Sequence, residues 1–504
     1  MIGRGWLAAI LLLGCAAAAA AKPFVCPRTG GDFVFGLDRL PDREIVMNTQ
    51  EALIARDEAN RPVLDLASAM TESADHLRYT FTLRAGIAFH NGKPLTSTDV
   101  AASFDRYARS AAGRTILDGV AGWDTPDPAT FVIRLHAPGP VFIEALSGFA
   151  APVAIVPAED RDSPSPPGTG PFRYQETGPD GSVVLRRNDA YQPNPAFADR
   201  TGFGGRKLAC LNSVTFRPVM DPGDRAEGLK AGELDAVEDL PPRSLPDLKK
   251  DPDLAILPMR HWWIQIAIVN VSAPPTDNVL FRRAIQAALD MDEIMEAATG
   301  GEYSLNAGFQ YPNQPAYSEA GKDTYNIKDP ERAKALLTGS GYGGETVVLL
   351  TNKDDPPMYN AALVAQQQLQ AIGINAELKV VDRATSIQMA RQSATGWNVF
   401  FTAWGMAPAQ GALAAMRLLA DPNTGYRPLN SPGDPGLLSA WADMTGLPDP
   451  AGRQAAFARM QAIALDQVYA IPFGTLTKIQ GTRANVRGFA PFRIPRLFNV
   501  WFAE

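Results

Sequence analysis

Residues 77–100 read LRYTFTLRAGIAFHNGKPLTSTDV, a stretch that combines the patterns of a strand, a turn and a helix. Apolar and polar residues alternate over 78–84, as expected for a half-buried strand. The Asn-Gly pair at 91–92 favours a turn. Thr96 is followed three residues later by Asp99, a variant of the capping box, which predicts that a helix begins here.

The segments on either side extend an α/β pattern. Residues 130–136 alternate like residues 78–84 and predict a second strand, and the Pro- and Gly-rich residues 157–171 predict a boundary loop. After residue 265, buried strand-like runs alternate with amphipathic helices, one of them predicted to be capped by Asp277. Short strand–helix–strand connections predict a largely parallel sheet. We therefore expect two lobes, the first with a mixed sheet and the second with an α/β sheet.

Composition limits the class of protein. The chain has 504 residues, 46% hydrophobic and 20% charged, with a formal net charge of −7. This length predicts roughly three structural units, and the hydrophobic fraction excludes wholesale disorder. The acidic balance argues against nucleic acid as a partner, because no basic surplus is available to neutralise phosphates. Four histidines leave little material for a histidine-built metal centre.

Residues 1–21 have the features of a signal peptide. Arg4 precedes the apolar run 6–13, and small residues up to Ala21 offer a signal-peptidase site. The apolar run is too short to span a bilayer. We expect cleavage after Ala21 and a protein exported to the periplasm. The alternative is a lipoprotein anchored through Cys15, which ends a loosely matching lipobox.

Export to an oxidising compartment also permits a disulfide. Cys26 and Cys210 each lie just before a strand-like run. We expect a bond between them that ties together two distant segments of one sheet, and the chain-entropy model gives such a bond about 4–5 kcal/mol. The alternative is two buried free thiols.

Familiar catalytic motifs are absent from the sequence. It contains no Gly-x-Ser-x-Gly elbow, no His-Glu-x-x-His, no Walker loop, no Cys-x-x-Cys and no EF-hand loop. The paired carboxylates at 238–239 and 354–355 lie in loop-like contexts, where solvated charge is the better interpretation. We expect no cofactor, no metal site and no enzymatic activity, unless a site is assembled from scattered residues.

Several local blocks follow one another in a characteristic order. Residues 77–100 form the strongest block, and the others are 51–67, 168–172, 185–191, 225–235, 281–285, 333–342 and 368–374. Together they resemble extracellular solute-binding protein family 5, the dipeptide, oligopeptide and nickel receptors of ABC importers. The resemblance covers nearly all of residues 30–500.

The resemblance implies an α/β, two-lobed periplasmic-binding-protein fold of the large, cluster C type, with an extra subdomain in the N-terminal lobe. Residues 22–260 would form that lobe with the subdomain inserted at about 50–165, residues 261–474 the C-terminal lobe, and residues 475–504 a return to the first lobe. Such receptors are monomeric clamps that bind a small-molecule or peptide solute between the lobes and deliver it to an ABC permease complex in the inner membrane.

The resemblance also indicates ligand-binding residues. Trp404 matches by family position, and Trp262 and Trp263 lie on the expected first crossing between the lobes. Arg417 is expected to clamp a carboxylate or phosphate, and Trp123 is a further candidate. For each residue there is a structural alternative, namely a core tryptophan, a surface ion pair or a surface loop.

One departure from the family affects the expected solute. Peptide receptors carry an acidic residue shortly after the tryptophan that corresponds to Trp404, and it pairs with the peptide's amino group. Residues 405–410 contain no carboxylate, and a buried ammonium without a partner is costly. We expect a peptide or a peptide-like or opine-like small polar solute. The alternatives are a nickel-type metal-chelate receptor, and a non-transport enzyme or sensor on the same scaffold.

Overall fold

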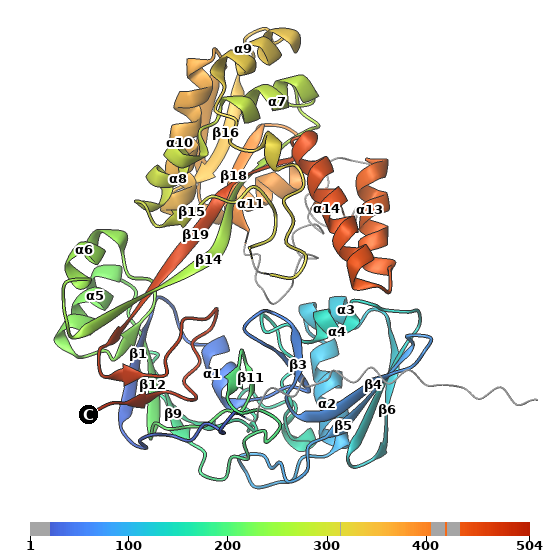
Figure 1. The fold of residues 1–504 in the computed structure, drawn as a ribbon, viewed down its shortest axis with the longest axis vertical. Helices are drawn as coiled ribbons and strands as arrows, with labels where there is room; N and C mark the ends of the chain where they lie inside the picture. Colours follow the sequence, from blue (N-terminus) through green and yellow to red (C-terminus); the bar gives the residue numbers. More distant parts are fainter. Residues whose placement is uncertain (1–20, 313, 405–418, 421–433) are drawn as a thin grey trace, which may run out of the picture. The chain divides into compact units, whose positions relative to one another are not determined.

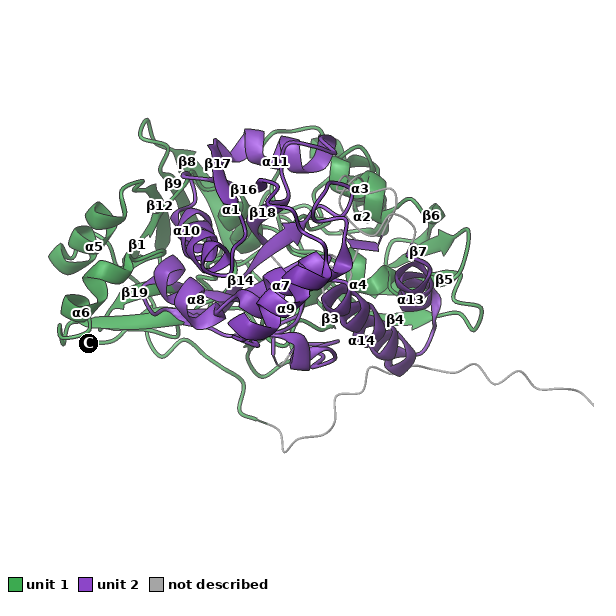
Figure 2. Ribbon diagram, turned by 90° about the horizontal axis from the view of Figure 1, so that it is seen from above, with its two compact units in different colours: residues 1–258, 479–504 green, residues 259–478 purple. Residues whose placement is uncertain are grey.

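The chain divides into two compact units. The computed structural model describes residues 21–312, 314–404, 419–420 and 434–504 (Figure 1). Unit 1 comprises residues 1–258 and 479–504, and unit 2 comprises residues 259–478 (Figure 2). The chain leaves unit 1 within strand β14 (Leu254–Val269) and returns to it within β19 (Ala470–Arg483). The expected signal peptide and Cys15 lie outside the described residues, except for Ala21.

Unit 1 is built on a mixed sheet, as the sequence predicts. Strand β1 pairs in parallel with β12 and β13, and β9 and β8 extend the sheet in the antiparallel sense. In β1 the alternate residues Phe33 and Phe35 are fully buried. The elements are β1 (Asp32–Leu37), α1 (Arg43–Thr49), β8 (Phe172–Thr177), β9 (Val183–Arg187), β12 (Ser213–Pro218), α5 (Pro222–Ala231), β13 (Ala236–Val237), α6 (Leu245–Leu248), β20 (Val486–Arg487) and β21 (Trp501–Phe502).

A second sheet of unit 1 contains the stretch 77–100. Its strands β4, β5, β7 and β6 are antiparallel, and α2 packs on them through Phe104, which contacts Phe131. The Thr96 amide donates to Asp99 (3.0 Å), so the predicted capping box is confirmed. The elements are β4 (Ala67–Glu72), β5 (Arg78–Leu83), α2 (Ser97–Ala108), α3 (Ala111–Ile116), β6 (Val120–Asp127), β7 (Thr130–Leu135) and α4 (Phe142–Leu146), with the short pairs β2 (Ile54–Arg56) and β3 (Pro62–Leu64), β10 (Arg200–Thr201) and β11 (Gly204–Gly205).

Unit 2 is a sheet with helices on both faces. Residues 399 and 401 of β18 pack with α7–α10, whereas Phe400 and Trp404 pack with α11, α13 and α14. The elements are α7 (Val279–Ala288), α8 (Met291–Thr299), β15 (Tyr303–Ser304), α9 (Pro330–Gly339), β16 (Val347–Asn352), α10 (Pro356–Ala371), β17 (Ala376–Val381), α11 (Arg383–Gln392), β18 (Val399–Trp404), α13 (Pro435–Gly446) and α14 (Pro450–Asp466).

Two expectations for unit 2 need correction. Strand β16 is parallel to β17 and β18, as predicted, but β14 is antiparallel to β18. The direction of β14 is set by the chain's passage from unit 1 and not by a strand–helix–strand crossover. The cap of α7 is Asn278, whose side chain accepts from the Leu280 amide (2.8 Å), and not the neighbouring Asp277.

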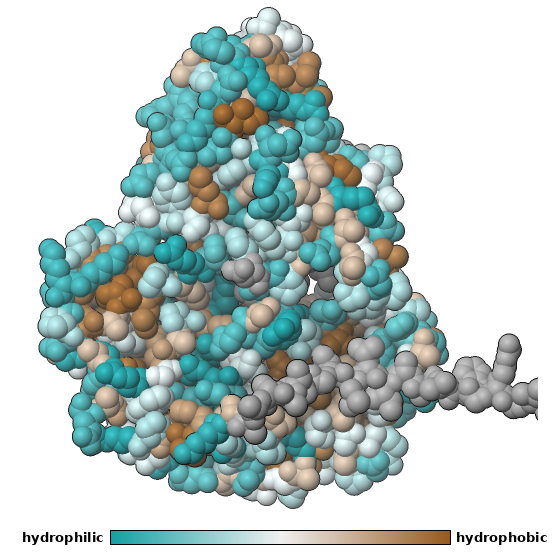
Figure 3. Space-filling model, in the orientation of Figure 1, coloured by the Kyte–Doolittle hydropathy of each residue, from teal (hydrophilic) through white to brown (hydrophobic). Residues whose placement is uncertain are grey.

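The surface in Figure 3 is mostly hydrophilic, with apolar side chains gathered where α5 and α6 lie. Leu229 of α5 and Leu245 and Leu248 of α6 are buried in one apolar cluster with Val237 of β13. Within the described residues, no helix combines the length and the apolar character needed to cross a bilayer.

Candidate functional site

Trp404 is the last residue of β18, at the carboxyl end of the parallel strands of unit 2. Open α/β sheets bind their ligands at this end. The side chain is 5% exposed and lies beside Phe309, with ring centroids 6.1 Å apart. Its indole Nε1 is buried and has no acceptor among the described residues, although a buried tryptophan N–H usually finds one. A ligand-binding role for this indole stays a prediction.

Trp262 and Trp263 lie next to that end of the sheet. They precede Ile264 of β14, which pairs with Trp404, and their rings stack with centroids 6.4 Å apart. The Lys478 ammonium lies 5.0 Å from the centre of the Trp262 ring. Aromatic faces beside a cation can hold planar or anionic polar groups.

His261 shapes the backbone before this tryptophan pair. It has a positive φ of 60°, and its Nδ1 is 2.9 Å from the Thr475 hydroxyl. The Tyr311 hydroxyl donates to the Trp262 carbonyl (3.0 Å). These contacts connect β14 to β19 and to the loop that contains Tyr311. They hold the backbone at Trp262 and Trp263 in place.

The other candidate residues lie apart from this group or cannot be placed. Trp123 is in β6 of unit 1, where its ring packs edge-on against Phe104 (5.7 Å). This contact belongs to the core of the second sheet, and a ligand-binding role for Trp123 stays a prediction. Arg417 lies outside the described residues, as do residues 405–410.

The predicted disulfide is confirmed. Cys26 and Cys210 are bonded, with Cα atoms 5.5 Å apart. Cys210 precedes β12 and is fully buried. The bond therefore fixes the chain ahead of β1 to the strand that pairs with β1.

A buried ionic cluster in unit 1 was not predicted from the sequence. Lys207 Nζ contacts Glu51 Oε1 (2.6 Å) and Asp65 Oδ1 (2.9 Å), and all three side chains are almost completely buried. Tyr191 donates its hydroxyl proton to Glu51 (2.8 Å), and so does Thr169 (2.9 Å). The cluster joins two distant stretches of unit 1, residues 51–65 and residues 169–207.

The two carboxyl groups of this cluster differ in acidity. Burial, together with the charge of Glu51, raises the pKa of Asp65 to about 6. Burial also disfavours the charged form of Glu51. The positive charge of Lys207 and its hydrogen bond to Glu51 favour that form more strongly, so the pKa of Glu51 is lowered. Glu51 is thus the ionised partner of Lys207, whereas Asp65 takes up a proton in mildly acidic conditions.

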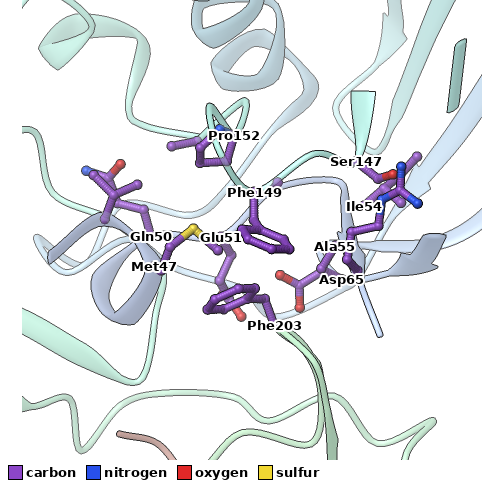
Figure 4. Close-up of a pocket in the computed structure, with 14 residues that line it drawn as sticks. Met47, Gln50, Glu51, Ile54, Ala55, Asp65, Ser147, Phe149, Pro152 and Phe203 are labelled. Atoms are coloured by element: carbon purple, nitrogen blue, oxygen red, sulfur yellow. The ribbon is translucent and has the colours of Figure 1, made fainter. Parts of the chain in front are cut away.

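A small pocket adjoins the cluster. Its wall includes Glu51, Asp65, Arg56 and the two phenylalanines Phe149 and Phe203, whose rings are 5.1 Å apart (Figure 4). In the sequence, Asp65 is a carboxylate between two leucines in an otherwise apolar block, and this is the one local sign of the cluster.

A second charged group lies at the carboxyl end of β1. Arg39 contacts Asp38, Glu44 and Glu238, and the two glutamates are 1% exposed. Glu238 directly follows β13, the parallel neighbour of β1. Across the described ranges there is no group of three or more His, Cys, Asp or Glu side chains arranged to hold a metal ion.

Sequence comparison gives a family match over most of the chain. Residues 61–425 match the bacterial extracellular solute-binding proteins, family 5, middle segment. A Sinorhizobium fredii protein named "probable peptide ABC transporter periplasmic-binding protein" is 26% identical over 474 residues, which cover 89% of this chain and 87% of that one. The glutathione-binding protein GsiB of Salmonella choleraesuis is 26% identical over 442 residues, which cover 84% of this chain and 83% of that one.

Solved structures share the fold at lower identity. The ABC transporter substrate-binding protein CtaP of Listeria monocytogenes has a TM-score of 0.80 at 20% identity, over 95% of this chain and 100% of that one. AgaA of A. tumefaciens R10, solved with agropinic acid, has a TM-score of 0.72 at 24% identity, over 94% of this chain and 99% of that one. DppA of Helicobacter pylori, solved with the peptide STSA, has a TM-score of 0.73 at 19% identity, over 95% of this chain and 99% of that one. The expected α/β, two-lobed periplasmic-binding-protein fold is confirmed by these likenesses.

Proposed function

The chain belongs to the bacterial extracellular solute-binding proteins of family 5, and from this premise we propose that it is the periplasmic solute-binding component of an ABC importer. Its solute is a peptide or a peptide-like or opine-like small polar molecule, which it delivers to a permease complex in the inner membrane. It acts as a monomer, binds no nucleic acid and does not transform its solute.

The observation that carries this proposal is the family match over residues 61–425. Relatives that cover more than four fifths of the chain are named for peptide and glutathione binding. A structure solved with an opine-type ligand, agropinic acid, shares the fold. For the nickel-type alternative, the related structure is NikZ of Campylobacter jejuni, solved with Ni(L-His). It is 16% identical to this chain, so the likeness supports a shared fold and not a shared ligand.

Within unit 2, Trp404 is the residue best suited to contact the solute. It combines a position at the carboxyl end of β18 with an indole N–H that lacks an acceptor among the described residues. Trp262 and Trp263 supply aromatic faces beside it, and Arg417 supplies a cation. Trp123, in unit 1, stays a separate candidate for contact with the solute.

Native mass spectrometry of the protein purified from periplasm, before any unfolding step, tests the proposal. We expect a bound organic species whose fragments identify a peptide or an opine-like molecule. A bound metal mass would favour the nickel-type receptor. An unliganded mass, combined with no thermal shift in a panel of peptides and opines, would contradict the proposal, and turnover of a bound candidate would favour an enzyme.

A further inference from the structure

A single glutamine of α14 holds the loop that follows β15 in unit 2. Gln461 is fully buried, and its Oε1 accepts from the Phe309 amide (3.1 Å). Its Nε2 donates to the carbonyls of Ser318 and Ala320, at 2.9 Å each. One side chain therefore fixes two separate stretches of this loop to the helix.

The first of these stretches is stiffened by hydrogen bonds of its own. The Asn306 side chain donates to the carbonyls of Gly308 (3.0 Å) and Gln310 (3.2 Å). The Gln310 side chain in turn accepts from the Tyr311 amide (2.9 Å). Satisfied networks of buried polar side chains make the backbone around them rigid. Phe309 and Tyr311 are therefore carried by one rigid piece of chain.

These two aromatic residues reach two different tryptophans of the candidate site. The Phe309 ring lies beside the Trp404 ring, with centroids 6.1 Å apart. The Tyr311 hydroxyl donates to the Trp262 carbonyl (3.0 Å). Within the described residues, the hydrogen bonds of the Gln461 side chain all go to the loop. The loop is therefore a physical connection between this glutamine and both tryptophans.

We infer that Gln461 is a positioning residue of the solute site. Through the loop it sets where the Trp404 ring and the Trp262 backbone lie, and thereby how tightly the solute binds. The inference rests on the proposed function for the role of these tryptophans in binding. It adds to the site a residue of α14 that acts only through the loop.

Gly308 offers a second way to disturb the same contact. A Cβ on this residue would lie 2.5 Å from Gln461 Oε1 and 3.0 Å from its Cδ. Because interiors are close-packed, either the loop or the glutamine must move to make room. Both movements change the contact between the loop and α14, and neither requires that Gln461 be replaced.

Gln286 is a matched control. It is a second buried glutamine of unit 2, on α7, and it also bonds to α14, where its Nε2 donates to the Leu465 carbonyl (3.4 Å). That bond does not involve the loop. A comparison of the two glutamines therefore separates an effect on the loop from the general effect of removing a buried amide beside α14.

The first test needs no ligand. The full mature chain is labelled with 5-fluorotryptophan, and its fluorine resonances are assigned by replacing each tryptophan in turn with phenylalanine. In Gln461→Leu we expect the resonances of Trp404 and Trp262 to move by more than a linewidth and that of Trp397 to stay in place. Gln286→Leu should move none of the three.

Two further variants follow the connection step by step. Gly308→Ala should reproduce the movement of both resonances, and it decides the question if Gln461→Leu does not fold. Tyr311→Phe removes only the hydroxyl that reaches the Trp262 carbonyl. It should therefore move the Trp262 resonance and leave that of Trp404 in place.

The second test measures binding. The probe is the solute that native mass spectrometry recovers from the unaltered chain, identified by its fragments and then removed by dialysis. Residues along a packed connection between sites change coupling by about 0.5–2 kcal/mol, so calorimetry should show about 2- to 30-fold weaker binding to Gln461→Leu. Gln286→Leu should bind as the unaltered chain does.

Unmoved Trp404 and Trp262 resonances in Gln461→Leu or Gly308→Ala would overturn the inference, and so would an unmoved Trp262 resonance in Tyr311→Phe. Equal movement of Trp397 would also overturn it, because unit 2 would then have loosened as a whole. Moved resonances with unchanged affinity would remove Gln461 from the solute site and leave the proposed function intact. Recovery of no solute at all, with no thermal shift in the panel of peptides and opines, would contradict the proposed function, while the resonances would still decide whether Gln461 positions the tryptophans.

Discussion

Two tryptophans, Trp397 just before β18 and Trp404 at its last residue, differ in one hydrogen bond. Trp397 Nε1 donates to the Ser393 carbonyl (2.9 Å), whereas Trp404 Nε1 has no acceptor among the described residues. Both rings are buried. An N–H without an acceptor among the described residues adds no hydrogen bond from them to the stability of the fold, and a donor at this position fits the proposed role in binding.

Trp404→Phe and Trp397→Phe should therefore separate binding from stability. We expect Trp397→Phe to cost about 1–3 kcal/mol more of unfolding free energy than Trp404→Phe, because it leaves a carbonyl unpaired. Trp404→Phe should weaken binding of the natural solute, measured by calorimetry, and Trp397→Phe should not. Equal affinities for the two variants would remove Trp404 from the proposed site.

Asp65 gives unit 1 a specific dependence on pH. Its pKa is about 6 in the folded chain against about 3.9 in an unfolded one, so protonation of Asp65 favours the fold. This contribution is fully present below about pH 4 and is lost as the pH rises through 6. The shift corresponds to about 3 kcal/mol.

Asp65→Asn should remove this dependence. We expect the free energy of unfolding of the variant, relative to the unaltered chain, to improve between about pH 4 and pH 6 and to level off above pH 6, as measured by urea denaturation. Glu51→Gln is the control with the opposite sign, because the lowered pKa of Glu51 contributes stability that is present above its usual pKa of 4.5 and is lost as the pH falls below that value. A pH-independent difference for Asp65→Asn would contradict this account.

The ionic cluster shows why parts of the site could not be predicted from the sequence. Lys207 is separated from Asp65 by 142 residues and from Glu51 by still more. No local pattern records such a pairing, and Arg56 likewise depends on a carbonyl 88 residues away. By contrast, the position of Trp404 at the end of a strand is visible in the sequence, and the family resemblance points to it directly.

At the scale of elements, local signals predicted well. The capping box at Thr96 joins residues three apart, so the start of α2 could be recognised directly. The strands at 78–84 and 130–136 followed from alternation alone. The predicted cap of α7 was wrong by one residue. Asp277 and Asn278 are both residue types that cap helices well, and the backbone of the preceding turn decides between them.

The loop 168–170 illustrates how two glycines position a polar residue. A Cβ on Gly168 would lie 2.0 Å from the Thr49 carbonyl oxygen, and one on Gly170 would lie 2.7 Å from the Thr49 carbonyl carbon. The absence of both side chains lets the loop pack against the end of α1. Thr169 is thereby held within hydrogen-bond distance of Glu51.

Gly168→Ala should consequently cost at least about 2–3 kcal/mol of unfolding free energy, because backbone must move against backbone. Gly119→Ala is the matched control, since nothing lies within 4 Å of its added Cβ. Urea denaturation measures both variants. A cost for Gly168→Ala no larger than that for Gly119→Ala would mean that the loop shifts freely.

At the scale of the whole molecule, the two units have separate hydrophobic cores. The core residues of unit 2 come from 264–473, and those around α2 come from 53–155. Changes confined to one unit should therefore act on that unit's unfolding transition. The disulfide offers a direct test, because both of its cysteines belong to unit 1.

The double variant Cys26→Ala/Cys210→Ala should lower the unfolding free energy of unit 1 by about 2–5 kcal/mol, mainly because the unfolded chain regains freedom over a long loop. Scanning calorimetry should show the transition of unit 1 at a lower temperature and that of unit 2 unchanged. Equal shifts of both would show that the units unfold as one cooperative body.

The two crossings of the chain also set the order in which the units can be completed during synthesis. Unit 2 is one continuous segment and is available to fold once residue 478 has been made. Unit 1 must wait for the last 26 residues, because Asn48 donates to the carbonyl of Pro495 and Arg496 pairs with Glu58. The half of the protein that is made first is thus the last to mature, and its buried surfaces need protection until the carboxyl terminus arrives.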